Sequence, residues 1–162
     1  MPIIKLETEI KTDIRICFDL ARSIDFHKLS TGKTKEQAID GKTSGLIGLD
    51  EFVTWQATHF GLRQKLTSRI TAFENPSHFR DEQEKGPFKL ICHDHYFEQK
   101  ADKVNMKDVF YFESPFGIFG RLFNQLILTK YLTKFIVERN TLLKEFTETD
   151  KWKTVLKEEE YL

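Results

Sequence analysis

Two histidines and one aspartate occupy positions from which side chains could transfer protons. His93 and His95 alternate within residues 88–99, and an extended strand there would point both imidazoles to the same face. Asp108 lies in the next apolar stretch, residues 104–112, and a neighbouring strand would bring it beside them if the two faces coincide. Two imidazoles near a carboxylate can move protons at neutral pH. These three residues are therefore the candidate catalytic residues.

The same three residues are open to two other interpretations. They could form a hydrogen-bonded polar patch that orients a ligand or satisfies itself within the core. They could also contribute to a metal site, in which Asp108, His59 or Glu51 would join the two histidines. The polar patch is favoured because histidine pairs on strands commonly occur without a metal. We expect neither a metal nor a cofactor.

The segments that position these side chains are mostly strands. The spacing of apolar residues and the turn residues between segments indicate one strand, two short helices, six strands and a long helix. The expected ranges are 3–10 (strand), 13–22 and 23–30 (helices), 37–40, 49–58, 62–73, 79–84, 88–99 and 104–112 (strands), and 116–146 (helix). Short turns join successive strands, so we expect an antiparallel sheet. Phe26 and Leu29 of the second helix should point inward, whereas His27, His59 and His78 fall near turns and should face solvent.

The helix expected at residues 116–146 is too apolar for a surface helix. Up to Leu128 its apolar side chains point in nearly every direction, so this half must be covered on more than one side. Pro115 suits the entrance of a helix. The second half should expose a charged stripe made of Lys130, Lys134, Glu138, Arg139 and Lys144. The sheet should therefore clasp the first half of the helix.

The order of these elements, with three short motifs, resembles the helix-grip fold of the START-like, or SRPBCC, superfamily. The motifs are GLIGLDEFVTW (45–55), HDHYFE (93–98) and MKDVFYFESPFG (106–117), which are similar to its polyketide cyclase-like branch. The resemblance covers about residues 3–146. It implies an α+β, START/Bet v 1-like fold in the order β-α-α-β6-α, with a seven-stranded curved antiparallel sheet around a long C-terminal helix. Residues 44–48 do not reproduce the glycine-rich loop of the plant allergen branch, so the details of hormone binding do not transfer.

The resemblance also implies an elongated cavity between sheet and helix. With 15 Phe in 162 residues, the chain can build either an aromatic-lined cavity or a solid aromatic core. Trp55 would offer a flat wall to a ring or acyl chain, unless it is an ordinary core residue. The cavity-lining candidates are Trp55, His93, His95, Phe97, Asp108, Phe110, Phe112, Phe119, Phe123 and Leu126. We expect a ligand to lie beside the last three and away from the charged end of the helix.

Length and composition place further bounds on the protein. The length indicates a single domain, here residues 1–146, followed by a charged tail, residues 147–162, whose docking or disorder is left open. The 25 basic and 25 acidic residues give no net charge, which argues against a nucleic-acid binder that relies on phosphate neutralisation. No stretch is apolar enough to span a bilayer or to form the core of a signal peptide. Cys17 and Cys92 are far apart in the sequence and should be small core residues, so a disulfide framework is not expected and a cytoplasmic location is. We also expect a monomer or a weak homodimer.

The resemblance leaves three functional hypotheses. Superfamily members bind lipids, sterols, plant hormones or polyketides, and a minority catalyse cyclisation or aromatisation. The main hypothesis is therefore a non-catalytic protein that binds an apolar or amphipathic, lipid- or polyketide-like molecule. The alternative is a cyclase- or dehydratase-type enzyme that uses His93, His95 and Asp108. The third is a protein-interaction module that uses the sheet edge or the tail.

Overall fold

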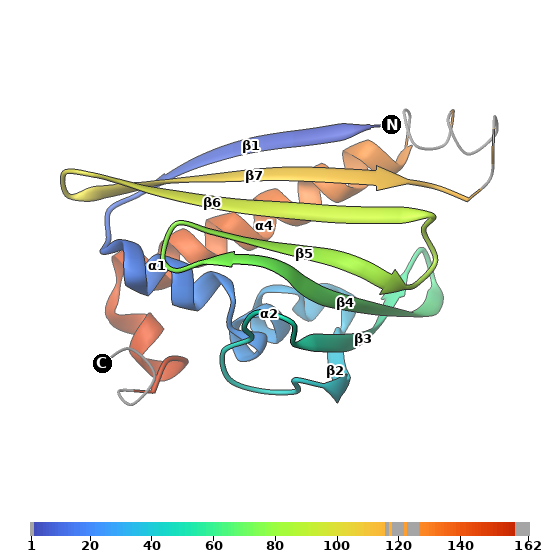
Figure 1. The fold of residues 1–162 in the computed structure, drawn as a ribbon, viewed down its shortest axis with the longest axis horizontal. Coiled ribbons are helices and arrows are strands. Elements are labelled where there is room, and N and C mark those ends of the chain that lie inside the picture. Colours follow the sequence, from blue (N-terminus) through green and yellow to red (C-terminus); the bar gives the residue numbers. More distant parts are fainter. Residues whose placement is uncertain (1, 116, 118–121, 123–126, 158–162) are drawn as a thin grey trace.

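Seven antiparallel strands form one sheet in the order β1-β7-β6-β5-β4-β3-β2 (Figure 1). The computed structural model describes residues 2–115, 117, 122 and 127–157. The elements are β1 (Ile3–Ile10), α1 (Ile14–Ala21), α2 (Ile24–Ser30), the 3-10 turn η1 (Gly32–Thr34), β2 (Gln37–Gly41), β3 (Phe52–His59), β4 (Leu62–Glu74), β5 (His78–Lys85), β6 (Leu90–Lys100), β7 (Lys103–Glu113), α4 (Thr129–Glu148) and the 3-10 turn η3 (Asp150–Thr154). The predicted element order and the seven-stranded antiparallel sheet are confirmed. The strand expected from residue 49 begins later, because Asp50 has a positive φ of 63° in the preceding turn.

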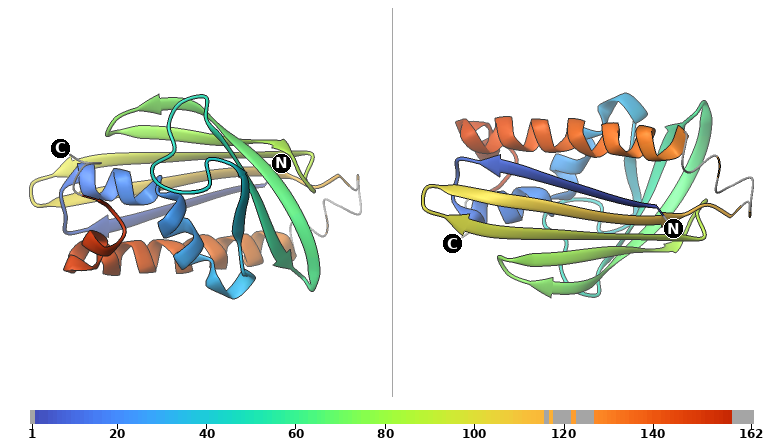
Figure 2. Two further views of the ribbon diagram at one scale, coloured as in Figure 1. Left: turned by 90° about the horizontal axis from the view of Figure 1, so that it is seen from below. Right: turned by 90° about the horizontal axis from the view of Figure 1, so that it is seen from above.

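The sheet is strongly curved, and irregular pairing accompanies the curvature. The register shifts between Ala38 and Asp40 in the β2–β3 pair, and at two places in the β4–β5 pair. Bulges of this kind bend a strand and increase its local twist. Figure 2 shows β3 and β4 bending toward α4, while β1 and β7 run beside it. The helix therefore lies in the concave face of the sheet, as the predicted helix-grip arrangement requires.

The two short helices begin at capping residues. Asp13 accepts a hydrogen bond from the backbone N–H of Arg15, and Ser23 accepts one from that of Phe26. Phe26 is fully buried, as predicted, but Leu29 is 55% exposed, so its predicted inward orientation is wrong. The buried side chains of α2 belong to its first turn, whereas its last turn lies at the surface.

Replacing Ser23 by Ala should test this cap. Its hydroxyl oxygen lies 3.2 Å from the Phe26 nitrogen in a buried setting, so the loss should lower the free energy of unfolding by about 1 kcal/mol. Urea unfolding would measure the change, with the exposed Ser44→Ala as the matched control, expected to change stability by less than about 0.5 kcal/mol. Equal effects of the two substitutions would contradict a stabilising role for the cap.

The core divides into two apolar clusters. In the larger one, the Phe18 ring contacts the rings of Phe73, Phe79 and Phe97 edge-on, with centroid distances of 5.4–5.6 Å. The smaller one consists of Ile4, Ile91, Phe110, Phe112, Leu128 and Ile136. Cys17 is buried in the larger cluster and Cys92 is buried in β6, as predicted for both cysteines.

The described part of the C-terminal helix is α4, which begins at Thr129. Its predicted first half lies mostly outside the described residues, and Phe119, Phe123 and Leu126 are among those not described. The predicted exposed charged stripe agrees with the exposure of Lys130 and Lys134. The prediction is wrong for Arg139, which is 6% exposed.

The described part of the tail, residues 147–157, docks onto the domain. Leu156 is 2% exposed within the larger core cluster, and Trp152 and Val155 pack against that cluster. Within the described ranges, no helix is both long and apolar enough to cross a membrane.

Candidate ligand-binding cavity

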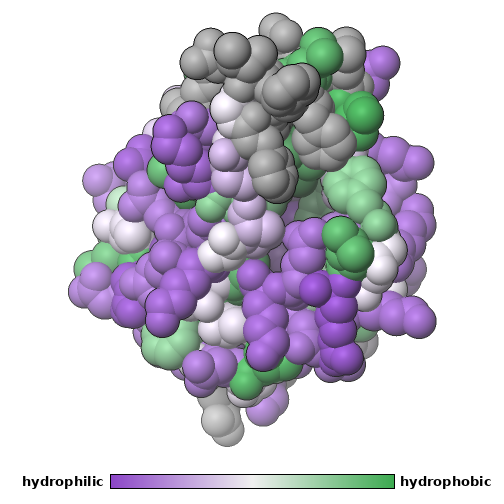
Figure 3. Space-filling model, turned by 90° about the vertical axis from the view of Figure 1, so that its right-hand side faces the viewer, coloured by the Kyte–Doolittle hydropathy of each residue, from purple (hydrophilic) through white to green (hydrophobic). Residues whose placement is uncertain are grey.

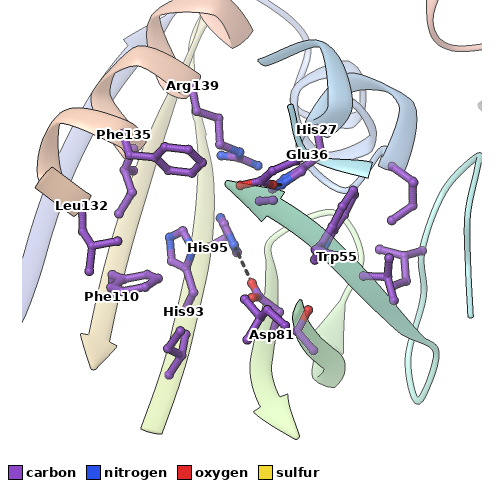
Figure 4. A pocket seen from close by; sticks show the side chains of 18 of the residues that line it. His27, Glu36, Trp55, Asp81, His93, His95, Phe110, Leu132, Phe135 and Arg139 are labelled. Atoms are coloured by element: carbon purple, nitrogen blue, oxygen red, sulfur yellow. Dashed lines mark hydrogen bonds and ion pairs between the residues drawn. The ribbon is translucent and has the colours of Figure 1, made fainter. Parts of the chain in front are cut away.

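A cavity of about 190 Å³ lies between the sheet, α2 and α4 (Figure 4). Most of its wall is apolar, and the apolar lining includes Val53, Trp55, Ile70, Phe110, Leu132, Phe135 and Ile136. The cavity also contacts the exposed residues Lys65 and Pro87, so it reaches the surface near the β3–β4 and β5–β6 turns. Figure 3 shows the side of the molecule that lies at the right of Figure 1, where apolar surface stands among polar side chains. Residues of both core clusters, such as Val53 and Phe110, therefore line the cavity.

A buried polar network lies at one wall of the cavity. His93 Nε2 and His95 Nδ1 lie 2.9 and 3.1 Å from the same oxygen of Asp108, Oδ1. Asn140 Nδ2 donates to the other oxygen, Oδ2, at 2.6 Å. On its cavity side, His95 Nε2 lies 3.0 Å from Asp81 Oδ2 (Figure 4). Four elements, β5, β6, β7 and α4, therefore meet at this network.

Strand register explains why these side chains meet. In the β6–β7 pair, His95 is directly opposite Asp108, and in the β5–β6 pair, Asp81 is directly opposite His93. Directly opposite residues of an antiparallel pair point to the same face of the sheet. This register places His93, His95 and Asp108 on the same face of the sheet, as predicted.

The charges of this network are coupled. Burial would raise the pKa of Asp108, but the hydrogen bond of His93 and the close contact and charge of His95 outweigh it and hold the pKa well below its usual range. Burial would also raise the pKa of Asp81, but the hydrogen bond from His95 and the charges of both histidines lower it. Burial and the neighbouring His95 lower the pKa of His93, whereas the two carboxylates overcome the burial of His95 and raise its pKa. A proton bound by the network is therefore held mainly on His95, between Asp108 and Asp81.

A second polar cluster faces the cavity from α2, β3 and the segment before β2. The carboxylate of Glu36 lies 2.5 Å from His27 Nε2 and 3.6 Å from His59 Nε2. His59 Nδ1 contacts the Tyr131 hydroxyl at 2.7 Å, and the His27 ring stacks on Trp55 with a centroid distance of 4.1 Å. The prediction that His27 and His59 face solvent is wrong, because Glu36 and the aromatic rings hold both imidazoles at the cavity wall.

His78 also differs from its prediction. Its imidazole Nε2 lies 2.8 Å from Asp94 on the opposite face of the sheet, and its side chain is only 16% exposed. Asp94 also accepts two hydrogen bonds from Arg80, at 2.8 and 2.9 Å. This pairing covers the outer face of the sheet behind the cavity wall.

Arg139 brings a buried positive charge to the cavity. Its Nη2 donates to the backbone oxygen of Ala21 at 2.8 Å, and its Nη1 donates to Asn140 Oδ1 at 3.3 Å. Its charge also contributes to the lowered pKa of Asp81. The cavity wall therefore includes Arg139, a residue of the charged half of α4 that a ligand was expected to avoid.

The predicted lining residues fall into three groups. Trp55, His93, His95 and Phe110 contact the cavity. Asp108 lies one layer behind the histidines, and Phe97 and Phe112 are enclosed in the two core clusters. The remaining three, Phe119, Phe123 and Leu126, are outside the described residues.

The sequence reasoning missed Asp81, Glu36 and Arg139. Among the residues that the structure describes, Asp81, His93 and His95 place one possible metal-ligand atom each within 4.8 Å of one another. The sequence suggested Asp108, His59 or Glu51 as the third metal ligand beside the two histidines. None of them occupies the position that Asp81 has in the structure. Asp108 lies behind the rings, His59 contacts Tyr131, and Glu51 accepts from the Gly48 N–H at 2.7 Å. The strand at 79–84 gave one signal for Asp81, since period-two alternation places Asp81 on the same face as Phe79.

Comparison with known proteins shows the fold and nothing finer. No family model and no curated protein matches the sequence. Among solved structures, a protein of Thermus thermophilus is similar at a TM-score of 0.73 and 16% identity, covering 89% of this chain and 95% of that one. The ginseng (Panax ginseng) major latex-like protein 151 is similar at 0.68 and 15% identity (91% and 98%). A START superfamily protein from Mycobacterium smegmatis is similar at 0.68 and 8% identity (88% and 97%).

Proposed function

We propose that this protein, which has the START-like helix-grip fold, binds an apolar or amphipathic small molecule between its sheet and α4. The observation that carries the proposal is a cavity with apolar walls from both layers and polar groups gathered at two places. An apolar cavity of about 150 Å³ can hold benzene, so about 190 Å³ is enough for a ring or a short chain. Ligand pockets in general combine such walls with a few placed polar groups.

The polar groups support orientation of a ligand rather than turnover. Both oxygens of Asp108 already accept hydrogen bonds or contacts from neighbours, and His95 is held between two carboxylates. Burial of about 200 Å² of ligand apolar surface would supply roughly 5 kcal/mol of binding free energy, at about 25 cal/mol per Å². Such a ligand would be lipid- or polyketide-like in its apolar part.

The direct test is to identify a small molecule that copurifies with the protein. Native mass spectrometry and organic extraction of protein purified from its own host should reveal a copurified apolar molecule. An apolar fluorescent probe should bind with a stoichiometry of one per chain and be displaced by that molecule. A protein that contains no such molecule and takes up no probe would argue strongly against the proposal.

Filling the cavity should weaken binding. Ala57 is 7% exposed and lines the cavity, so Ala57→Leu would place three further carbons in the space that the ligand needs. We expect probe affinity to fall about tenfold or more, which corresponds to about 1.4 kcal/mol. Thr58→Leu is the matched control, because the neighbouring residue on the same strand points to the exposed face. If both variants bind like the wild type, the probe lies elsewhere.

A cyclase- or dehydratase-type enzyme is the second candidate function. It is favoured by one observation, namely that His93 and His95 contact both the cavity and a buried carboxylate. His93→Phe separates the two functions. A binding protein should keep or gain affinity for an apolar ligand, whereas an enzyme should lose turnover while it still binds.

The two cysteines support a proposal about the cellular location of the protein. Cys17 and Cys92 are both buried and not disulfide-bonded. Free thiols are usual in reducing compartments, which supports the cytoplasm as the proposed location.

A further inference from the structure

We propose that Asp81, His93 and His95 form a binding site for one divalent transition-metal ion of the zinc class at the cavity wall. Their candidate ligand atoms lie within 4.8 Å of one another, and His95 Nε2 is 3.0 Å from Asp81 Oδ2. Two imidazoles and one carboxylate make up a donor set found in catalytic zinc sites, which keep a further position open. The adjacent cavity would supply that open position.

The sheet holds the three donors in a fixed relation. His93 and His95 are two residues apart on β6, and Asp81 is the direct partner of His93 on β5. All three side chains therefore project from two hydrogen-bonded strands to the same face. Ligand atoms about 2.1 Å from a tetrahedral zinc ion are about 3.4 Å apart. The donors lie within 4.8 Å of one another and would have to approach further, and the Asp81 side chain, 27% exposed, has room to rotate.

Asp108 acts on the far side of the two rings as an outer carboxylate. Its Oδ1 lies 2.9 Å from His93 Nε2, and Asn140 Nδ2 fixes its Oδ2 at 2.6 Å. Metal-binding histidines commonly donate their other ring N–H to a carboxylate in this way, which fixes the ring and its tautomer. With a hydrogen on His93 Nε2, the lone pair of His93 is on Nδ1, the nitrogen that remains for a metal.

His95 is only partly satisfied without a cation. Its side chain is 4% exposed, and its Nδ1 contacts Asp108 Oδ1 at 3.1 Å without forming an aligned hydrogen bond. Buried polar nitrogens are normally hydrogen-bonded. Coordination at Nε2 would fix a hydrogen on Nδ1 and turn the ring toward its carboxylate, so a metal would complete both contacts.

The balance of buried charge also favours a cation. Asp81 and Asp108 carry two negative charges, and Arg139 is the positive charge that acts on Asp81 from α4. With both imidazoles neutral, this group of four side chains and Arg139 has a net charge of −1. Asp108 is fully buried, and a divalent ion bound on the other side of the two rings would offset part of this negative charge.

Titration of the untagged, chelator-treated protein with Co²⁺ tests the proposal without any organic ligand. We expect one cobalt per chain, a visible absorption spectrum typical of a tetrahedral or five-coordinate site, and loss of that spectrum on addition of Zn²⁺. Asp81→Asn and His93→Gln should each weaken binding at least tenfold. Glu82→Gln, the neighbour of Asp81 on the opposite face of β5, should bind like the wild type.

Histidine NMR supplies a readout that does not depend on cobalt absorption. Zn²⁺ should shift the imidazole signals of two of the five histidines, and these should be the two that change in the His93→Gln and His95→Gln spectra. Two results would overturn the site. One is the absence of stoichiometric cobalt binding by folded protein. The other is binding that Asp81→Asn and His93→Gln leave unchanged, with shifts confined to other histidines.

Discussion

Replacing Asp108 by Ala is expected to lower the free energy of unfolding by about 3–5 kcal/mol. The residue is 0% exposed, and its carboxylate is the common partner of His93, His95 and Asn140. Removal would leave a buried amide N–H and the imidazole nitrogens without an acceptor. It would also remove one of the two carboxylates that raise the pKa of His95. Urea unfolding at pH 7, followed by circular dichroism, would measure the loss.

Two comparisons make this prediction specific. Asp102→Ala removes a carboxylate whose side chain is 64% exposed, from the turn between β6 and β7, and should change stability by less than about 0.5 kcal/mol. In a double-mutant cycle, Asp108→Ala and Asn140→Ala should be non-additive by about 0.5–3 kcal/mol, because the two side chains share one hydrogen bond. A loss below about 1 kcal/mol for Asp108→Ala, or full additivity with Asn140→Ala, would refute the network.

The sequence predicted the half of the site that depends on one strand pair. Period-two alternation places His93 and His95 on one face of β6 and Asp108 on one face of β7. A two-residue turn between these strands then leaves little freedom in register, and His95 lies opposite Asp108. The order of the helices and strands could also be predicted from the sequence, because short polar turns separate stretches of clear hydrophobic periodicity.

The other half depends on contacts between distant segments, which periodicity does not report. Asp81 belongs to a strand that appears short and polar in the sequence, and its position opposite His93 depends on the β5–β6 register. Glu36 and His59 meet because β2 and the segment before it return beside β3, although each residue alone looks like a surface group near a turn. The sequence pattern predicts that Arg139 is exposed on a charged helix. In the structure it is buried, because its guanidinium donates to the backbone oxygen of Ala21 at the C-terminal end of α1.

Replacing Glu36 by Gln is expected to destabilise the protein at pH 7 by about 3 kcal/mol and to change its response to acid. Burial would raise the pKa of Glu36, but the charge and hydrogen bond of His27, together with His59, lower it from 4.5 to about 2. A carboxyl group whose pKa is lower in the folded state stabilises that state at any pH above its unfolded value. Its contribution is therefore complete above about pH 4.5 and lost as the pH falls toward 2, and a shift of this size corresponds to about 3 kcal/mol.

Urea unfolding of wild type and Glu36→Gln at several pH values would measure this contribution. The difference in unfolding free energy should be largest at pH 5–7 and should shrink toward zero near pH 2, because a protonated Glu36 and a glutamine are both neutral. Asp81 and Asp108 have lowered pKa values as well, so the variant should keep part of the acid sensitivity of the wild type. Glu98→Gln, whose carboxylate is 66% exposed, should follow the wild-type curve throughout. A difference between wild type and Glu36→Gln that stays constant from pH 7 to pH 2 would mean that the substitution acts through packing and that Glu36 does not carry a stabilising charge.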